Sequence, residues 1–184
     1  LDPSRAEIFS MLQMYRDEFV KENDNFILFY AGHGGKDGDD GFWCPSDIQM
    51  DKSSSRVYNT EIHREIKKFN AKNILLITDA CWASAMVVRG NEVSYDINKE
   101  YKLQDAYNKK TRFMLSSGGE STVPNKSVFM HYLVDYLKEN QKKYLSVREL
   151  FYEIKKDVDR ESPIIDGVPV SPELNILNTQ QHKS

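Results

Sequence analysis

The sequence predicts an α/β fold in which a mostly parallel sheet carries helices on both faces. Two observations support this prediction. Two short, largely apolar runs, 26–31 and 74–78, have the length and composition of strands that are buried on both faces, and residues 112–116 are predicted to form a third strand. Segments with helical periodicity alternate with these runs, and such alternation is typical of parallel strands joined by crossover helices.

Apolar residues recur every three to four positions in four segments, which we predict to be helices: 4–22, about 60–69, 127–140 and 146–158. The first follows Asp2, Pro3 and Ser4, which combine a capping residue with an early proline. The polar stretch 36–58 is predicted to be an excursion with a short strand near 42–44. Residues 174–177 are predicted to form a short final strand.

Length and composition limit the possible partners. The 184 residues, 40% of them apolar, suffice for one hydrophobic core, so we expect one domain over residues 1–184. Acidic and basic residues number 28 and 25, and no basic run is interleaved with aromatic residues. We therefore expect neither a nucleic acid nor a membrane partner. No apolar run approaches the roughly 20 residues that span a bilayer, and the first residues lack the features of a signal peptide.

The chain has only two cysteines, Cys44 and Cys81. Two thiols are too few for a disulfide scaffold, and sparse free cysteines are typical of a reducing interior, so we expect a cytoplasmic location. Cys44 lies in an apolar context and is expected to be a buried packing residue.

Ligand sites in parallel α/β sheets lie beyond the carboxyl ends of the strands. His33 follows the strand predicted at 26–31, and Cys81 follows the strand predicted at 74–78. The predicted topology therefore places both side chains at one edge of the sheet. A thiol becomes a strong nucleophile when a base within hydrogen-bond reach takes its proton, so His33 is the candidate base for Cys81.

Backbone groups near these residues suit the same chemistry. Gly34 has no side chain, so its N–H group can approach a reacting carbonyl closely, and we pair it with the N–H group of Cys81 as an oxyanion hole. A helix is expected to start at Cys81, where its positive end would favour the thiolate. Each residue alone can also be interpreted as structural, because a single buried cysteine is more often a core residue and a single histidine at a strand end is more often structural than catalytic.

Two segments around these residues resemble the catalytic motifs of the caspase-like peptidases, the group of caspases, metacaspases and paracaspases. They are Phe-Tyr-Ala-Gly-His-Gly at 29–34 and Leu-Ile-Thr-Asp-Ala-Cys-Trp-Ala-Ser at 76–84. Cys81 lies 48 residues after His33, close to the spacing found in caspases. Residues 41–47, 113–120 and 127–129 resemble later parts of the same family.

This resemblance implies a caspase-like three-layer sandwich and a cysteine endopeptidase that forms an acyl-enzyme. Cys81 would attack the peptide carbonyl, and His33 would protonate the leaving amine. The implied chemistry uses no metal and no organic cofactor, and the implied partner is a protein or peptide substrate.

The residue two positions before the cysteine bears on substrate preference. Caspases have Gln there, whereas this chain has Asp79, as metacaspase-like and paracaspase-like members do. A buried carboxylate prefers a cationic partner, which predicts Arg or Lys at the substrate position P1. Glu120 is a candidate second acidic wall of this pocket, and Trp82 is a candidate lining residue. The alternatives are that Asp79 caps a helix, that Glu120 is solvated and that Trp82 only packs.

The chain departs from the family pattern at its start, where the usual first strand, helix and second strand are absent. We expect the sheet to show an open edge and exposed apolar surface there. The expected partner is that amino-terminal segment, or a larger parent protein with sensor modules.

Asp37, Asp39 and Asp40 form an acidic loop, but their spacing does not fit an EF-hand, so we expect a solvated loop and no metal. Two rival functions are found on folds of this class. A catalytically silent scaffold of the same fold would bind partners without cleaving them. A nucleotide-binding domain is disfavoured because no glycine-rich phosphate-binding motif follows a predicted strand.

Overall fold

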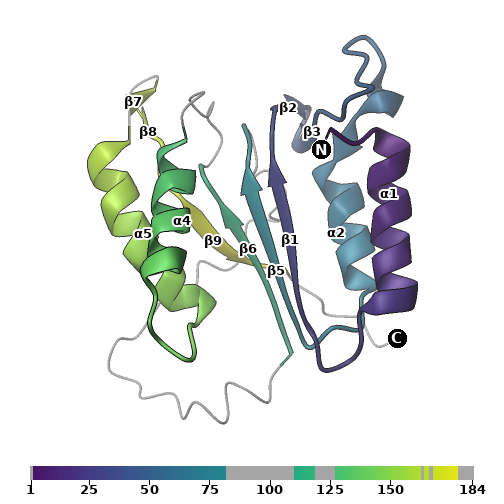
Figure 1. Cartoon of the computed structure of the whole chain (residues 1–184). Coiled ribbons are helices and arrows are strands. Elements are labelled where there is room, and N and C mark those ends of the chain that lie inside the picture. Colours follow the sequence, from purple (N-terminus) through teal and green to yellow (C-terminus); the bar gives the residue numbers. More distant parts are fainter. Residues whose placement is uncertain (1, 82–109, 119–126, 163, 166–167, 178–184) are drawn as a thin grey trace, which may run out of the picture.

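A four-stranded sheet forms the centre of the computed structural model, which describes residues 2–81, 110–118, 127–162, 164–165 and 168–177 (Figure 1). The strand order is β1-β5-β6-β9. The strands are β1 (Asn25–Ala31), β5 (Asn73–Asp79), β6 (Thr111–Ser116) and β9 (Glu173–Ile176). β1, β5 and β6 are parallel and β9 is antiparallel to β6, which confirms the predicted mostly parallel sheet.

The second strand in this order, β5, is buried over six consecutive residues. Ile74 and Leu76 pack into one apolar core, and Leu75 and Ile77 pack into a second core on the other side of the sheet. Because successive side chains of a strand point to opposite faces, a strand between two cores must be apolar at nearly every position. This requirement explains why an uninterrupted apolar run identified β5.

Helices cover both faces of the sheet, as Figure 1 shows. One layer consists of α1 (Arg5–Met14), the π-helical turn η1 (Tyr15–Phe19) and α2 (Asn59–Lys67). The other layer consists of α4 (Val128–Glu139) and α5 (Val147–Glu161). The start of α1 is fixed by a capping box, in which the Ser4 hydroxyl accepts from the Glu7 amide and the Glu7 carboxylate accepts from the Ser4 amide.

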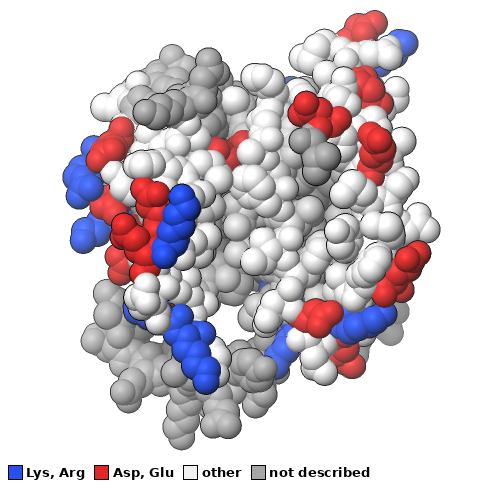
Figure 2. Space-filling view, viewed as in Figure 1, with Lys and Arg blue, Asp and Glu red and all other residues white. Residues whose placement is uncertain are grey.

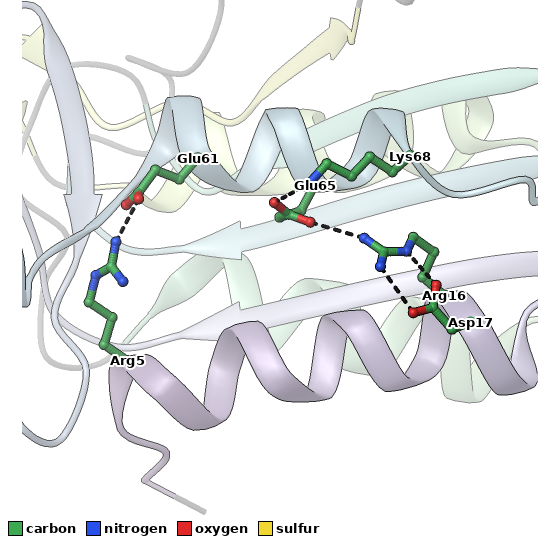
Figure 3. Close-up of polar contacts among 6 residues, drawn as sticks. All are labelled: Arg5, Arg16, Asp17, Glu61, Glu65 and Lys68. Atoms are coloured by element: carbon green, nitrogen blue, oxygen red, sulfur yellow. Dashed lines mark hydrogen bonds and ion pairs between the residues drawn. The ribbon is translucent and has the colours of Figure 1, made fainter.

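Ion pairs connect the two helices of the first layer (Figure 3). The Arg5 guanidinium at the start of α1 lies 2.5 Å from the Glu61 carboxylate of α2. Nearer the other end, Arg16 lies 3.4 Å from Glu65, which also pairs with Lys68 at 2.6 Å. These contacts fix α1 against α2 on the outer side of the core.

The strand β1 differs from its prediction, because it is not buried on both faces. Phe26, Leu28 and Tyr30 pack against the core beneath α1 and α2, whereas Ile27 and Phe29 on the opposite face are 61% and 46% exposed. Among the described strands, β1 pairs only with β5, so it forms an edge of the sheet. Figure 2 shows that charged side chains in this view lie mainly over the helices, while the middle of the molecule is largely uncharged.

A small antiparallel sheet follows β1 directly. It consists of β2 (Gly34–Asp37), β3 (Asp40–Trp43) and β4 (Val57–Tyr58). The turn between β2 and β3 contains Gly38 with φ of 60°, a conformation that favours glycine. The sequence predicted a short strand near 42–44, which is observed as β3, but it did not predict the two partner strands. The pairing of β3 with β2 matters for the site because it places His33 beside the end of β3.

The other predicted elements are close to their observed bounds. The helix predicted at 4–22 is α-helical only to Met14 and then widens into η1. Small elements that the sequence did not reveal are η2 (Ser53–Ser55), β7 (Ile164–Ile165) and β8 (Val168–Pro169). All of them have two or three residues, too few to carry a recognisable period.

Candidate active site

His33 and Cys81 follow neighbouring strands that end at the same level. β1 and β5 are parallel and in register, with Ala31 opposite Asp79. The pairing continues for one more bond, from the Gly32 amide to the Asp79 carbonyl at 3.2 Å. His33 and Cys81 are therefore each two residues beyond a paired strand position, at the carboxyl edge of the sheet. The His33 side chain is exposed, and Cys81 is half-buried.

The backbone of Gly34 lies directly against Cys81. A Cβ atom on Gly34 would lie 2.4 Å from the carbonyl oxygen of Cys81 and 3.1 Å from that of Phe42. Real Cβ atoms essentially never approach backbone so closely, so this position requires glycine. The segment that carries His33 thus contacts the segment that carries Cys81.

Tyr30 holds the backbone of His33. Its hydroxyl donates to the His33 carbonyl at 2.7 Å and lies 3.4 Å from the Cys44 carbonyl. Its ring stacks on Trp43, with centroids 4.2 Å apart and planes within 4°. Burial raises the pKa of Tyr30, so the hydroxyl stays protonated and remains a donor at any physiological pH.

Cys44 lies beside the same histidine, a position that sequence reasoning missed. The Cys44 amide donates to the His33 carbonyl at 2.9 Å. The side chain is half-buried rather than buried, so the expected role as a core packing residue is wrong. Burial raises the pKa of the Cys44 thiol, and the charge of Cys81 raises it further. The register of the hairpin brings Cys44 beside His33, and no local sequence signal reports such a register.

Asp79 is a buried carboxylate at the end of β5. It is 8% exposed, and its Oδ1 atom has no hydrogen-bond partner among the described residues. The hydroxyls of Thr78, Ser116 and Ser117 are also buried at these strand ends, and each lacks a partner within the described part of the chain. Unpaired buried polar atoms are rare in folded proteins because each costs free energy, so the unpaired Oδ1 atom of Asp79 indicates a site for a polar ligand.

Ser117 is on the same face as Asp79. Leu75 and Ile77 of β5, and Leu115 of β6, pack in the core that also contains α4 and α5 residues. Since side chains alternate along a strand, Asp79 and Ser117 continue that face. The sequence indicated Asp79 but not Ser117, because a serine at a strand end has no distinctive spacing.

Three predictions fall outside the described residues: the pocket roles of Trp82 and Glu120, and the helix expected to follow Cys81.

The acidic loop is not simply solvated, which corrects one expectation. Asp37 pairs with the Arg56 guanidinium at 2.5 Å and accepts a hydrogen bond from the Tyr58 hydroxyl at 2.7 Å. The Tyr58 hydrogen bond, and after it the Arg56 charge, lowers the pKa of Asp37. Asp40 accepts from the Thr60 hydroxyl at 2.5 Å. In the described ranges, no three His, Cys, Asp or Glu side chains are grouped as a metal site.

Comparison with known proteins identifies the fold. A family model described as a caspase domain matches residues 1–181. The chain belongs to the caspase domain family. Its members are cysteine peptidases as a group, and the caspase domain of this chain has the fold that the sequence motifs implied. None of the curated protein sequences matches the chain.

A solved structure shares the fold of this caspase domain. The crystal structure of protein GSU0716 from Geobacter sulfurreducens superposes with a TM-score of 0.60 at 16% sequence identity. The match covers 97% of this chain and 75% of the Geobacter chain. At that identity the likeness concerns the fold alone. In the described part of the caspase domain, no helix is both long and apolar enough to cross a bilayer.

Proposed function

We propose that this caspase domain is a cysteine endopeptidase in which Cys81 is the nucleophile and His33 is the general base and acid. The observation that carries the proposal is the contact between the Gly34 backbone and the Cys81 carbonyl, together with the register of β1 and β5. The two features bring a histidine and a cysteine from separate strands to one small region of the sheet edge. Both residue types have the chemistry that thiol proteolysis needs.

The proposed reaction has two steps. In the first, the Cys81 sulfur attacks the carbonyl carbon of the scissile peptide, and His33 takes the thiol proton. The carbon–nitrogen bond then breaks as His33 gives that proton to the departing amine, which leaves a thioester on Cys81. In the second step, His33 removes a proton from a water molecule, the hydroxide attacks the thioester, and the Cys81 thiol and a free carboxylate are released.

Negative charge develops on the substrate oxygen in both steps. We assign its stabilisation to the N–H groups of Gly34 and Cys81, whose segments are already in contact. Removing one donor of such a pair costs about 10² to 10³ in kcat in enzymes of this type. The hydrogen bonds that Tyr30 and Cys44 give to the His33 carbonyl fix the orientation of the Gly34 peptide, and this supports the assignment.

We further propose that the P1 residue is Arg or Lys. Asp79 supports this preference because a buried carboxylate whose Oδ1 atom has no described hydrogen-bond partner is stabilised when a cation enters. Ser117, on the same face, would accept a further hydrogen bond from a guanidinium or ammonium group. Arginine fits best, since its planar group presents several donors to a carboxylate and a hydroxyl at once. Trp82 and Glu120 remain candidates for the walls of the pocket.

We also propose protein substrates in a cytoplasmic setting. The two cysteines do not form a disulfide with each other, which suits a reducing compartment. The side of β1 that has no strand neighbour among the described residues, and the exposed Ile27 and Phe29, support the expected partner, a segment that adds a strand there.

Cleavage of fluorogenic peptides that differ only at P1 tests the proposal. The wild-type chain is compared with Cys81→Ala, His33→Ala and Asp79→Asn, and His131→Ala on α4 is the matched histidine control. We expect cleavage after Arg or Lys, a loss of at least about 10²-fold in kcat/KM for the first two variants, and little change for the control. Asp79→Asn should lower kcat/KM for Arg substrates by roughly 30-fold or more.

The same peptides with an acyloxymethyl ketone warhead provide an independent readout, because a thioether on Cys81 can be mapped by mass spectrometry. Cysteine-dependent cleavage after another residue would keep the Cys81–His33 pair and reject the role of Asp79. Neither cleavage nor capture of Cys81, with the partner segment supplied, would reject the peptidase and favour a silent scaffold.

A further inference from the structure

The second cysteine of the chain is located at the proposed active site, although the peptidase reaction does not use it. Cys44 immediately follows β3, and its amide donates to the His33 carbonyl at 2.9 Å. Tyr30 bridges the carbonyl groups of His33 and Cys44 through one hydroxyl. Cys44 and His33 are therefore held as neighbours by three hydrogen bonds.

The register of the β2–β3 hairpin explains this placement. Gly34 pairs with Trp43, so the next pair outward is His33 with Cys44. Gly34 in turn contacts the carbonyl of Cys81. Cys44 is thus one ladder position from Gly34, the residue that lies against the nucleophile.

Electrostatics agree with this geometry. Burial raises the pKa of the Cys44 thiol, and the charge of Cys81 raises it further. Because its pKa is raised, Cys44 remains a neutral thiol near pH 7. It therefore does not add a second negative charge to the site of the reduced protein, in which neither cysteine forms a disulfide.

We propose that Cys44 is the resolving thiol of a redox switch, which closes a reversible disulfide with Cys81 after a hydroperoxide oxidises Cys81. The part of this inference that concerns the activation of Cys81 rests on the proposed function, because His33 is the base that makes Cys81 a thiolate. Closing the disulfide would block proteolysis and protect the nucleophile from irreversible oxidation.

The chemistry balances in two steps. The Cys81 thiolate attacks one oxygen of the hydroperoxide, the O–O bond breaks, and after protonation of the leaving oxygen the products are a sulfenic acid and water or an alcohol. The Cys44 sulfur then attacks the Cys81 sulfur, the S–O bond breaks, and water leaves with the Cys44 proton. The peroxide is the two-electron oxidant, and a dithiol reductant reverses the change through thiol–disulfide exchange.

Peptide mapping of the whole chain after treatment with hydrogen peroxide tests the switch. Trypsin separates the two cysteines into peptides 37–52 and 73–89, which end at Lys52 and Arg89. We expect a linked pair of these peptides, about 2 Da lighter than their sum, that disappears on reduction with dithiothreitol. Fragment ions must locate the change, because Met50 and Met86 are in the same peptides and can gain oxygen.

Cys44→Ser is the matched control, since it keeps the size of the side chain and removes only the resolving sulfur. In this variant we expect most of Cys81 to proceed to sulfinic and sulfonic acid, which dithiothreitol does not reverse. Cys44→Ala provides a second variant, and circular dichroism confirms that both are folded before treatment. Mixing ¹⁵N-labelled and unlabelled chains distinguishes a bond within one chain from a bond between two.

Two results would overturn the inference. One is the absence of the linked pair with equal over-oxidation of Cys81 in the wild type and Cys44→Ser. The other is a linked pair that joins labelled to unlabelled chains. If the oxidised protein gives a linked pair within one chain but the reduced protein cleaves no peptide substrate, the switch is upheld and the peptidase is rejected. The two proposals therefore fail separately.

Discussion

The hydroxyl of Tyr30 donates a 2.7 Å hydrogen bond to the backbone carbonyl of His33. Tyr30 does not belong to the proposed reaction, so we regard it as a positioning residue. Tyr30→Phe removes this bond and leaves the Cys44 amide as the other described donor to that carbonyl. We expect kcat to fall by roughly tenfold with little change in KM, and the free energy of unfolding to fall by about 1 kcal/mol.

The matched control is Tyr144→Phe, whose ring is mostly exposed. A Tyr30→Phe variant that loses stability but keeps the wild-type kcat would show that Tyr30 has only a structural role.

Gly34 should not tolerate a side chain. In Gly34→Ala the new methyl group would meet the Cys81 carbonyl at 2.4 Å, and backbone cannot move away as easily as the end of a side chain. We expect a loss of about 1 to 3 kcal/mol of stability and of nearly all peptidase activity. Gly38→Ala is the comparison, because a Cβ atom there would meet nothing within 4 Å, and its φ of 60° makes the substitution cost stability away from the site. Urea denaturation and kcat/KM should rank Gly34→Ala as clearly worse, and equal effects would argue against a special contact with Cys81.

The pair of Arg5 and Glu61 should contribute measurably to the contact between α1 and α2. Both side chains are partly buried, and the nitrogen–oxygen distance is 2.5 Å. A double-mutant cycle with Arg5→Gln and Glu61→Gln is expected to give a coupling free energy of about 0.5 to 1 kcal/mol. The exposed pair of Lys110 and Glu22 at 3.4 Å should give almost none. Raising the salt concentration should reduce the coupling, and a coupling unaffected by salt would indicate packing instead.

His63 on α2 should make stability depend on pH. Burial, and after it the charge of Lys67, lowers the pKa of His63. The unfolded chain, with a pKa near 6.5, then binds more protons than the folded chain once the pH falls below that value. Stability is therefore lost as the pH decreases from about 7 through the lowered pKa.

The urea midpoints of the wild type and His63→Gln at several pH values between 5 and 8 measure this effect by difference, since the carboxylates are common to both. We expect the urea midpoint of the wild type to fall relative to that of His63→Gln as the pH decreases. A gap that stays constant would contradict the role of His63.

The main strands and the proposed nucleophile and base were predictable because they depend on local patterns. A strand between two cores must be apolar at nearly every position, and β5 shows this pattern over residues 74–77. The carboxyl-edge rule for parallel sheets then places His33 and Cys81 together. The exposed face of β1 was not predictable from its composition, since Ile27 and Phe29 are as apolar as the residues of a buried strand.

The surroundings of the site escaped prediction for a different reason. Cys44 reaches His33 only through the register of a hairpin that begins four residues after Tyr30 and whose first strand, β2, has a Gly-Gly-Lys-Asp sequence without apolar residues. The buried hydroxyl of Ser117 is recognisable only from its burial and lack of a partner. Both features depend on contacts between segments that are distant in sequence.

The two halves of the proposed site should differ in how often they fluctuate. Cys81 is attached to β5, which is hydrogen-bonded to strands on both sides, and its displacement requires most of the sheet to open. His33 is attached to β1, which has one described neighbour, and its amides should exchange hydrogen through smaller openings. We therefore expect the segment that carries Cys81 to be the more rigid half of the site and the segment that carries His33 to be the more mobile half. A chain that bound along the side of β1 that has no described neighbour would then raise turnover by restricting the histidine, without touching the substrate.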